Sequence, residues 1–212
     1  MYVVGENVTK KIKDFVVLDN ISFSLEKGKV HGIRGHNGSG KTMLLRAIAG
    51  LIKLSDGKVV VDGKTIGKDI LFPEDVGVLI EYPSFIPDYT GFQNLLFLAK
   101  IKNKISEETI RETLNLIGLD PDDKRKFKKY SLGMKQRLGI AQAIMESPDL
   151  LLLDEPTNAL DEKGISFMEQ IIQRLKSEGK TIVVTSHDRD FLQEVSDDIY
   201  SISEGVVTKW ED

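Results

Sequence analysis

The sequence predicts an α/β fold, in which a mainly parallel sheet is joined by an antiparallel β portion and an inserted α-helical subdomain. Two uninterrupted apolar runs of strand length, at residues 150–153 and 181–185, are typical of parallel strands that helices cover on both faces. Residues 1–27 alternate apolar and polar side chains, which favours antiparallel strands. Residues 92–127 change to helical spacing between these two parts, as expected of an insertion.

The composition is that of a soluble protein with a substantial core. Of its 212 residues, 41% are hydrophobic and 29% are charged, and the net charge of −4 gives no basic surface for nucleic acid. The absence of cysteine excludes disulfides, thiolate metal sites and a cysteine nucleophile, and it suits the cytosol. No signal peptide is evident, and no apolar run approaches the roughly 20 residues that span a bilayer. We expect a single cytoplasmic domain over residues 1–212, with any membrane crossing left to another chain.

The first motif along the chain is a phosphate-binding loop. Residues 28–33 are short and apolar enough for a strand, and residues 43–49 have helical spacing, so the segment between them joins a strand to a helix. This segment fits the pattern Gly, four residues, Gly-Lys-Ser/Thr. It consists of Gly35, His36, Asn37, Gly38, Ser39, Gly40, Lys41 and Thr42.

Each part of this loop has a chemical reason. The glycines let successive backbone N–H groups converge on phosphate oxygens, and the following helix presents its positive N-terminal end. Lys41 can reach the β and γ phosphates, while the Thr42 hydroxyl can take a place on Mg²⁺. The loop therefore predicts a P-loop NTPase core that binds a nucleoside triphosphate.

The middle of the chain predicts a hairpin and then the helical subdomain. Asp-Gly at residues 62–63, between two apolar runs, is a strong hairpin signal. Residues 92–99 begin the helical pattern, and Ser106 is a suitable N-cap for a further helix. We place the helical subdomain at about residues 85–145. The connection that leads into it contains Pro73, Pro83 and Pro87, which favours an irregular segment and a hinge.

Alternating helices and buried strands return after residue 131. Residues 133–145 can be helical, and a second helix carries an apolar stripe for the core: Ile165, Met168, Ile171, Ile172 and Leu175. Asp154 and Glu155 directly follow the first buried strand, so their side chains point into the crevice where the phosphate loop opens. Asp154 can hold Mg²⁺ through its water shell, and Glu155 can orient and deprotonate the attacking water. The alternative is an acidic pair that ends a strand and faces solvent.

A third motif lies at residues 130–137, which read Tyr-Ser-Leu-Gly-Met-Lys-Gln-Arg. On first principles it is a serine N-cap at an exposed helix start, where free N–H groups can bind an anion. It also resembles the signature motif of ATP-binding cassette (ABC) ATPases, Leu-Ser-Gly-Gly-Gln followed by Gln-Arg. Residues 158–161 resemble the D-loop of that family and residues 185–188 its switch histidine. Because five motifs follow in the family's order along essentially the whole chain, the sequence is identified as a member.

The resemblance implies a dimer. In the family, two such domains pair head to tail, and each ATP lies between one phosphate loop and the signature helix of the partner. On this basis Ser131 and Gly133 would contact the γ phosphate of the ATP bound to the other subunit. His187 would contact the γ phosphate in its own subunit. Asp161 would connect the two sites or, alternatively, cap the following helix.

The sequence departs from the family pattern at three places. The signature carries Leu132 for its first glycine and Met-Lys at residues 134–135 for Gly-Gln. Glu81 stands at the Q-loop glutamine; it can still accept a Mg²⁺-bound water, but its charge would change metal affinity or pH response. Ile12 falls where an aromatic residue usually stacks on adenine; Phe15 could stack instead, or the adenine could rest on an aliphatic side chain. The Glu81 segment and the Ser-Leu-Gly signature resemble the bacitracin-exporter type of the family.

The resemblance implies the ATPase subunit of an ABC transporter, with export as the expected direction. Its ligands would be ATP and Mg²⁺, and its partners a second ATPase subunit, forming a homodimer, and a separate membrane-spanning permease. It would sit on the cytoplasmic face of the membrane, with no nucleic-acid partner. One alternative is a soluble ABC protein acting on ribosomes or DNA, although the second cassette or long coiled coils of such proteins are absent. The other is a nucleotide-dependent switch that scarcely hydrolyses, which the altered signature and Glu81 suggest.

Overall fold

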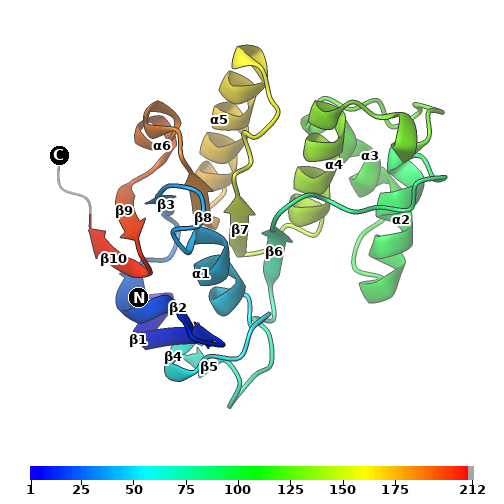
Figure 1. Cartoon of the computed structure of the whole chain (residues 1–212). Coiled ribbons are helices and arrows are strands. Elements are labelled where there is room, and N and C mark those ends of the chain that lie inside the picture. Colours follow the sequence, from blue (N-terminus) through cyan, green and yellow to red (C-terminus); the bar gives the residue numbers. More distant parts are fainter. Residues whose placement is uncertain (210–212) are drawn as a thin grey trace.

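The computed structural model describes residues 1–209, whose strands form two sheets (Figure 1). The strands are β1 (Val3–Ile12), β2 (Phe15–Leu25), β3 (Val30–Arg34), β4 (Asp56–Val61), β5 (Lys64–Thr65), β6 (Val76–Leu79), β7 (Leu150–Asp154), β8 (Thr181–Ser186), β9 (Asp198–Ser203) and β10 (Val206–Lys209). The larger sheet has the order β10-β9-β3-β8-β7-β6 and is parallel except for β10. The smaller, antiparallel sheet has the order β2-β1-β4-β5. The predicted fold class is confirmed.

Helices cover both faces of the parallel sheet. They are α1 (Lys41–Ile48), α2 (Gly91–Lys102), α3 (Glu107–Leu116), α4 (Leu132–Ile144), α5 (Glu162–Ser177) and α6 (Arg189–Val195), with a 3₁₀ turn at Phe127–Lys129. Alternate residues of β7 face different cores: Leu151 and Leu153 pack with α4 and α5, whereas Leu150 and Leu152 pack with α1 and the antiparallel sheet. This two-sided burial explains why β7 and β8 are continuously apolar in sequence.

Helix α1 lies between the two sheets, since it packs on β7 and β8 and also on β2 and β4 (Figure 1). The predicted hairpin is present, because β4 pairs with β5 across a two-residue turn. Asp62 and Gly63 have positive φ angles of 49° and 76°, as a type I′ turn requires. The antiparallel sheet is therefore held against the helix that begins at the phosphate loop.

Helices α2, α3 and α4 group together at one side of the molecule (Figure 1). Ser106 caps α3 as expected, by accepting the N–H of Thr109 at 3.2 Å. α4 packs so closely on β6 that a Cβ at Gly77 would lie 1.9 Å from the carbonyl oxygen of Ala143. The extent of a separate subdomain, about residues 85–145, stays a prediction.

One expectation about the connection into these helices is corrected. The three prolines do not share a single irregular segment, because β6 lies between Pro73 and the later pair, Pro83 and Pro87. The valines of β6 alternate with a glycine and a leucine over only four residues, too short a pattern to separate from a loop by periodicity. The connection that leaves the sheet is therefore the stretch from residue 80 to 90.

Candidate functional site

The phosphate loop connects the end of β3 to the start of α1. Gly38 and Gly40 have φ angles of 83° and 110°, in the left-handed region that favours glycine. The Lys41 ammonium lies inside the loop and donates to the carbonyl oxygens of Gly35 at 2.7 Å and His36 at 3.3 Å. A cavity of about 240 Å³ opens over it, lined by residues of the loop and of α1 together with Val17 and Glu155. The loop that the sequence predicted thus has the geometry of an anion-binding cradle.

Thr42, in the first turn of α1, donates its hydroxyl hydrogen bond to Asp154 Oδ2 at 2.7 Å. Asp154 ends β7 and is only 5% exposed. Its other oxygen, Oδ1, accepts a hydrogen bond from the buried Thr185 hydroxyl at 2.7 Å. The chain therefore brings together two of the three residues that were predicted to hold Mg²⁺, and Thr185 orients the carboxylate; the third, Glu81, pairs with Arg46.

Glu155 is the next residue, and its carboxylate joins two other predicted site residues. One oxygen, Oε1, lies 3.1 Å from Lys41 Nζ, and the other, Oε2, lies 2.9 Å from His187 Nδ1. Glu155 has a φ angle of 47°, which is uncommon outside glycine. The structure thus places a carboxylate between the lysine of the phosphate loop and the histidine that follows β8.

Two residues that sequence reasoning did not select also contribute to this region. Val17 of β2 reaches the cavity over the phosphate loop. Gln136 of α4 is 4% exposed and donates from Nε2 to the carbonyl oxygens of Glu155 and Pro156, both at 3.3 Å. Val17 has no signal of its own in the sequence. Gln136 is the glutamine of the Gln-Arg pair that follows the signature, but its contact with residues 155–156 depends on the fold.

The signature residues lie apart from the phosphate loop of their own chain, on the other side of β7 and β6 (Figure 1). Ser131 caps α4 by accepting the N–H of Met134 at 3.2 Å. A Cβ at Gly133 would lie 3.4 Å from the carbonyl oxygen of Ala159, so the start of α4 adjoins the segment between β7 and α5. In that segment Asp161 caps α5 by accepting the N–H of Gly164 at 2.9 Å, which was one of its two expected roles.

Phe15 starts β2, is 77% exposed, and lies two residues before Val17. The β1–β2 pairing is irregular here, since Lys10 pairs with Leu18 and Lys11 with Val16, so alternation along β2 does not place Phe15 on the side of Val17. Ile12, the other position considered for adenine, pairs with Phe15 across the β1–β2 hairpin and is also exposed. Both stay candidates for contact with a base.

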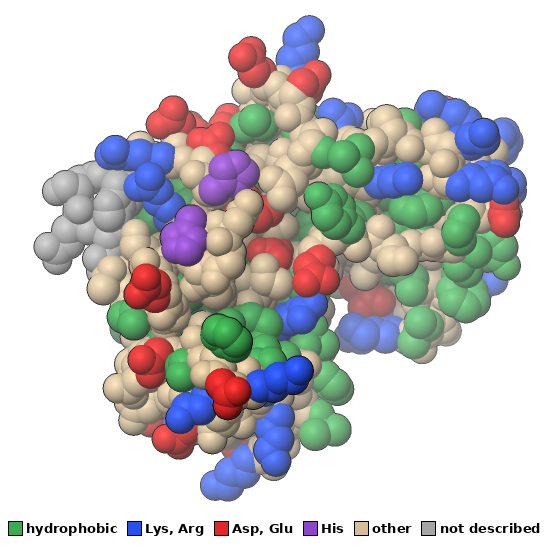
Figure 2. Space-filling model, in the orientation of Figure 1, with side chains coloured by type: hydrophobic (Ala, Val, Ile, Leu, Met, Phe, Trp, Pro, Cys, Tyr) green, Lys and Arg blue, Asp and Glu red, His purple; other side chains and the backbone are tan. Residues whose placement is uncertain are grey.

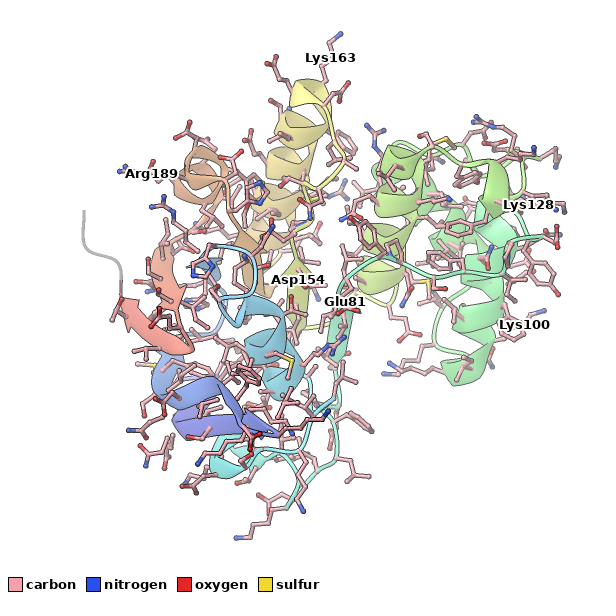
Figure 3. The ribbon with its side chains drawn as sticks, viewed as in Figure 1. Glu81, Lys100, Lys128, Asp154, Lys163 and Arg189 are labelled. Atoms are coloured by element: carbon pink, nitrogen blue, oxygen red, sulfur yellow. The ribbon has the colours of Figure 1, made fainter. Side chains whose placement is uncertain are left out.

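Glu81 follows the end of β6, next to the carboxyl end of β7, where Asp154 lies (Figure 3). Its carboxylate is 2.8 Å from Arg46, one helical turn after Thr42 on α1. This pair is partly exposed, at 32% for Arg46 and 60% for Glu81. A glutamate at this position thus has a counter-ion that a glutamine would not need.

The donor set at Thr42 and Asp154 suits Mg²⁺. Mg²⁺ prefers hard oxygen ligands, retains several waters and is commonly bound by one or two carboxylates together with substrate phosphates. Residues 1–209 contain no cluster of three or more His, Asp or Glu that would hold a metal without such a substrate. A hydroxyl and one buried carboxylate beside a phosphate loop are the arrangement expected for a metal that arrives with a nucleotide.

A phosphate loop, a strand ending in two carboxylates and a flanking parallel sheet define a P-loop nucleotide-binding protein. The family model described as ABC transporter matches residues 18–158. The chain belongs to this family, as an ATP-binding cassette that hydrolyses ATP. Of the part that the structure describes, no helix is long and apolar enough to cross a bilayer.

Among its relatives is YybJ of Bacillus subtilis (strain 168), an uncharacterized ABC transporter ATP-binding protein. It is 49% identical over 199 residues, which cover 94% of this chain and 91% of YybJ. The bacitracin transport ATP-binding protein BcrA of Enterococcus faecalis is 39% identical over 94% of this chain and 66% of its own length. The lantibiotic transport ATP-binding protein SrtF of Streptococcus pyogenes is 37% identical over 95% of this chain and 87% of its own.

Solved structures agree with the fold. The dimeric structure of MJ0796, a bacterial ABC transporter cassette, superimposes with a TM-score of 0.89 at 27% identity, covering 99% of both chains. A dimeric post-hydrolysis state of the same cassette, bound to ADP and Pi, gives the same values. The similarity thus extends over essentially the whole chain, including the helices α2 to α4.

Proposed function

We propose that two copies of this chain close head to tail around ATP and Mg²⁺, and that hydrolysis releases them to drive a separate export permease. The observation that carries the proposal is the Glu155 carboxylate, held between Lys41 at 3.1 Å and His187 at 2.9 Å. A carboxylate between the phosphate-loop lysine and a histidine is suited to take the proton of a water that attacks the γ phosphate. The separation of Ser131 and Gly133 from their own loop supports a dimer, because they are then available to the nucleotide of a partner.

Each residue has a distinct part in this reaction. The backbone N–H groups of the loop and Lys41 bind the β and γ phosphates, and Thr42 and Asp154 hold Mg²⁺. When bound, Mg²⁺ neutralises charge on the phosphate oxygens. Glu155 orients the water and accepts its proton, and His187 binds the γ phosphate. Phosphate binding would draw Lys41 away from Glu155, which leaves the carboxylate available to the water.

Surface apolar side chains support a partner at the membrane. Phe97 and Ile101 on α2 are 54% and 72% exposed, and Leu71 and Phe72 before β6 are exposed as well. Figure 2 shows apolar side chains on the surface of the helical part of the molecule. Phe97 and Ile101 are four residues apart on α2 and so lie on one face of the helix, and exposed apolar patches mark protein or membrane contact sites. Because BcrA and SrtF are named for bacitracin and lantibiotic transport, we propose an exporter whose ATPase docks on the cytoplasmic face of the membrane.

Hydrolysis by purified variants tests the catalytic assignment. Glu155→Gln removes the base but leaves the loop, so the rate of phosphate release should fall by about 10²–10⁴-fold while ATP still binds. Lys41→Ala should abolish ATP binding. Glu112→Gln, on the exposed face of α3, is the matched control and should keep the parental rate. A normal rate in Glu155→Gln would remove this residue from its role.

A pull-down tests the transport assignment. Purifying the tagged chain from gently solubilised membranes should co-purify a multi-span membrane protein. Recovery of ribosomes or DNA in its place would favour the soluble alternative and contradict the proposed permease.

A further inference from the structure

We propose that Gln136 is a positioning residue for hydrolysis, which fixes the backbone of Glu155 and so aims its carboxylate. The proposal rests on the function proposed above, because it needs Glu155 to be the base. It goes further because Gln136, on the signature helix α4, would then act on the hydrolysis of the ATP that its own chain binds.

The two sides of the Glu155 backbone are held by different elements. Its N–H donates to the Thr185 hydroxyl at 3.0 Å and to the Thr185 carbonyl at 3.2 Å, both on β8. Its carbonyl oxygen accepts from Gln136 Nε2 on α4 at 3.3 Å, and the next carbonyl, of Pro156, accepts from the same nitrogen at 3.3 Å. Gln136 is therefore the side chain that ties the exit from β7 to the helical part of the molecule.

This backbone needs support. Glu155 has a φ angle of 47°, and a residue other than glycine keeps a left-handed backbone conformation only where its surroundings hold it. The direction of the carboxylate depends on that conformation, since one oxygen faces Lys41 and the other faces His187. If the Glu155 backbone relaxed toward an ordinary φ, the carboxylate would change its direction relative to both Lys41 and His187.

The chemistry of glutamine suits this task. Its amide nitrogen carries two protons, one for each of the two carbonyl oxygens it contacts, and it is buried with no charge to desolvate. Methionine has a similar length and no donor, and glutamate has the same shape but only accepts when ionised. The two substitutions therefore remove the hydrogen bonds while largely preserving the packing.

The position of Gln136 on α4 adds a functional consequence. The start of the same helix carries Ser131 and Gly133, which the proposed function assigns to the nucleotide of the partner subunit. One rigid helix of this chain would thus connect the partner's ATP to the carboxylate that acts on the chain's own ATP. The hydrogen bond from Gln136 Nε2 to the Glu155 carbonyl oxygen joins this helix to the residue that carries the carboxylate.

Steady-state kinetics of Gln136→Met and Gln136→Glu test the proposal. Displacing a catalytic group by about 1 Å can cost 10²-fold in rate, so we expect kcat to fall by about 10- to 100-fold. KM for ATP and the Mg²⁺-dependent binding of a fluorescent ATP analogue should stay within about twofold, because the loop is untouched. Gln142→Met, at an exposed position of the same helix, is the matched control and should keep the parental kcat. If the kcat of both Gln136 variants equals the kcat of Gln142→Met, the proposal is overturned. If Gln136→Met fails to fold, the kcat of Gln136→Glu decides the test.

Dimerisation separates positioning of Glu155 from a general loosening of α4. In a Glu155→Gln background, adding Gln136→Met should leave the ATP-dependent dimer intact, as judged by light scattering. Loss of that dimer would show that Gln136 supports the signature helix itself, which contradicts the proposal. Failure of the proposed function would look different: Glu155→Gln alone would hydrolyse ATP normally or would form no dimer.

Discussion

Replacing Thr185 with valine should remove the hydrogen bonds that support Asp154 and Glu155 and lower the stability of the protein, while leaving β8 intact. Thr185 is fully buried, and its hydroxyl donates to Asp154 at 2.7 Å and accepts the Glu155 N–H at 3.0 Å. Valine keeps the β-branched shape but has neither function, although the Glu155 N–H still has the backbone carbonyl of residue 185 at 3.2 Å. Since a hydrogen bond to a charged group contributes about 1.5–3 kcal/mol, the free energy of unfolding should fall by about 2 kcal/mol. For a chain of this size that corresponds to a Tm lower by about 4–8 °C.

Urea unfolding followed by circular dichroism measures this loss, and the same strand supplies the control. Thr181 is also fully buried, but its hydroxyl accepts only the neutral Gly28 N–H at 3.0 Å. Thr181→Val should therefore cost about 1 kcal/mol. Equal losses in the two variants, or no loss in Thr185→Val, would refute the idea that the charged Asp154 is held by this hydroxyl.

Three further changes test other parts of the molecule. Burial lowers the pKa of His31 in the folded protein below its usual value of 6.5. Because His31 of the unfolded chain then binds a proton more tightly than His31 of the folded protein, the free energy of unfolding should fall as the pH drops below about 6.5. His31→Leu should reduce that slope in unfolding titrations between pH 7 and 5, and an unchanged slope would contradict this origin. Gly77→Ala places a methyl group against the Ala143 carbonyl, so the free energy of unfolding, measured in urea, should fall by about 3 kcal/mol. An unchanged free energy of unfolding would mean that α4 can move away from β6. Arg46→Gln breaks the partly exposed pair with Glu81 and should change stability by less than about 1 kcal/mol, whereas a larger change would show a buried role.

The sequence was sufficient where a feature is local. The phosphate loop, the buried strands β7 and β8 and the caps of α3 and α4 depend on residues adjacent in the chain, so spacing and residue type predict them. Asp154 was predictable too, since it directly ends a strand that must be buried. These are the parts of the fold in which short-range pattern and tertiary packing agree.

Other features depend on contacts that no pattern encodes. Val17 reaches the nucleotide cavity only because β2 folds over α1, and Gln136 meets Glu155 across 19 residues of chain. Arg46 gives Glu81 a counter-ion from an element 35 residues earlier. The strand β6 was hidden between prolines because four residues are too few to show a period. In each case the partner is set by tertiary packing.

On the proposed function, the phosphate loop at residues 35–42 forms half of a nucleotide site, which a second copy of the chain completes. The most direct measurement is the mass of Glu155→Gln by size-exclusion chromatography with light scattering, with and without ATP and Mg²⁺. The 23.7 kDa chain should be monomeric without nucleotide and should double in mass with ATP. A variant that binds ATP but keeps the mass of a single chain would contradict the account.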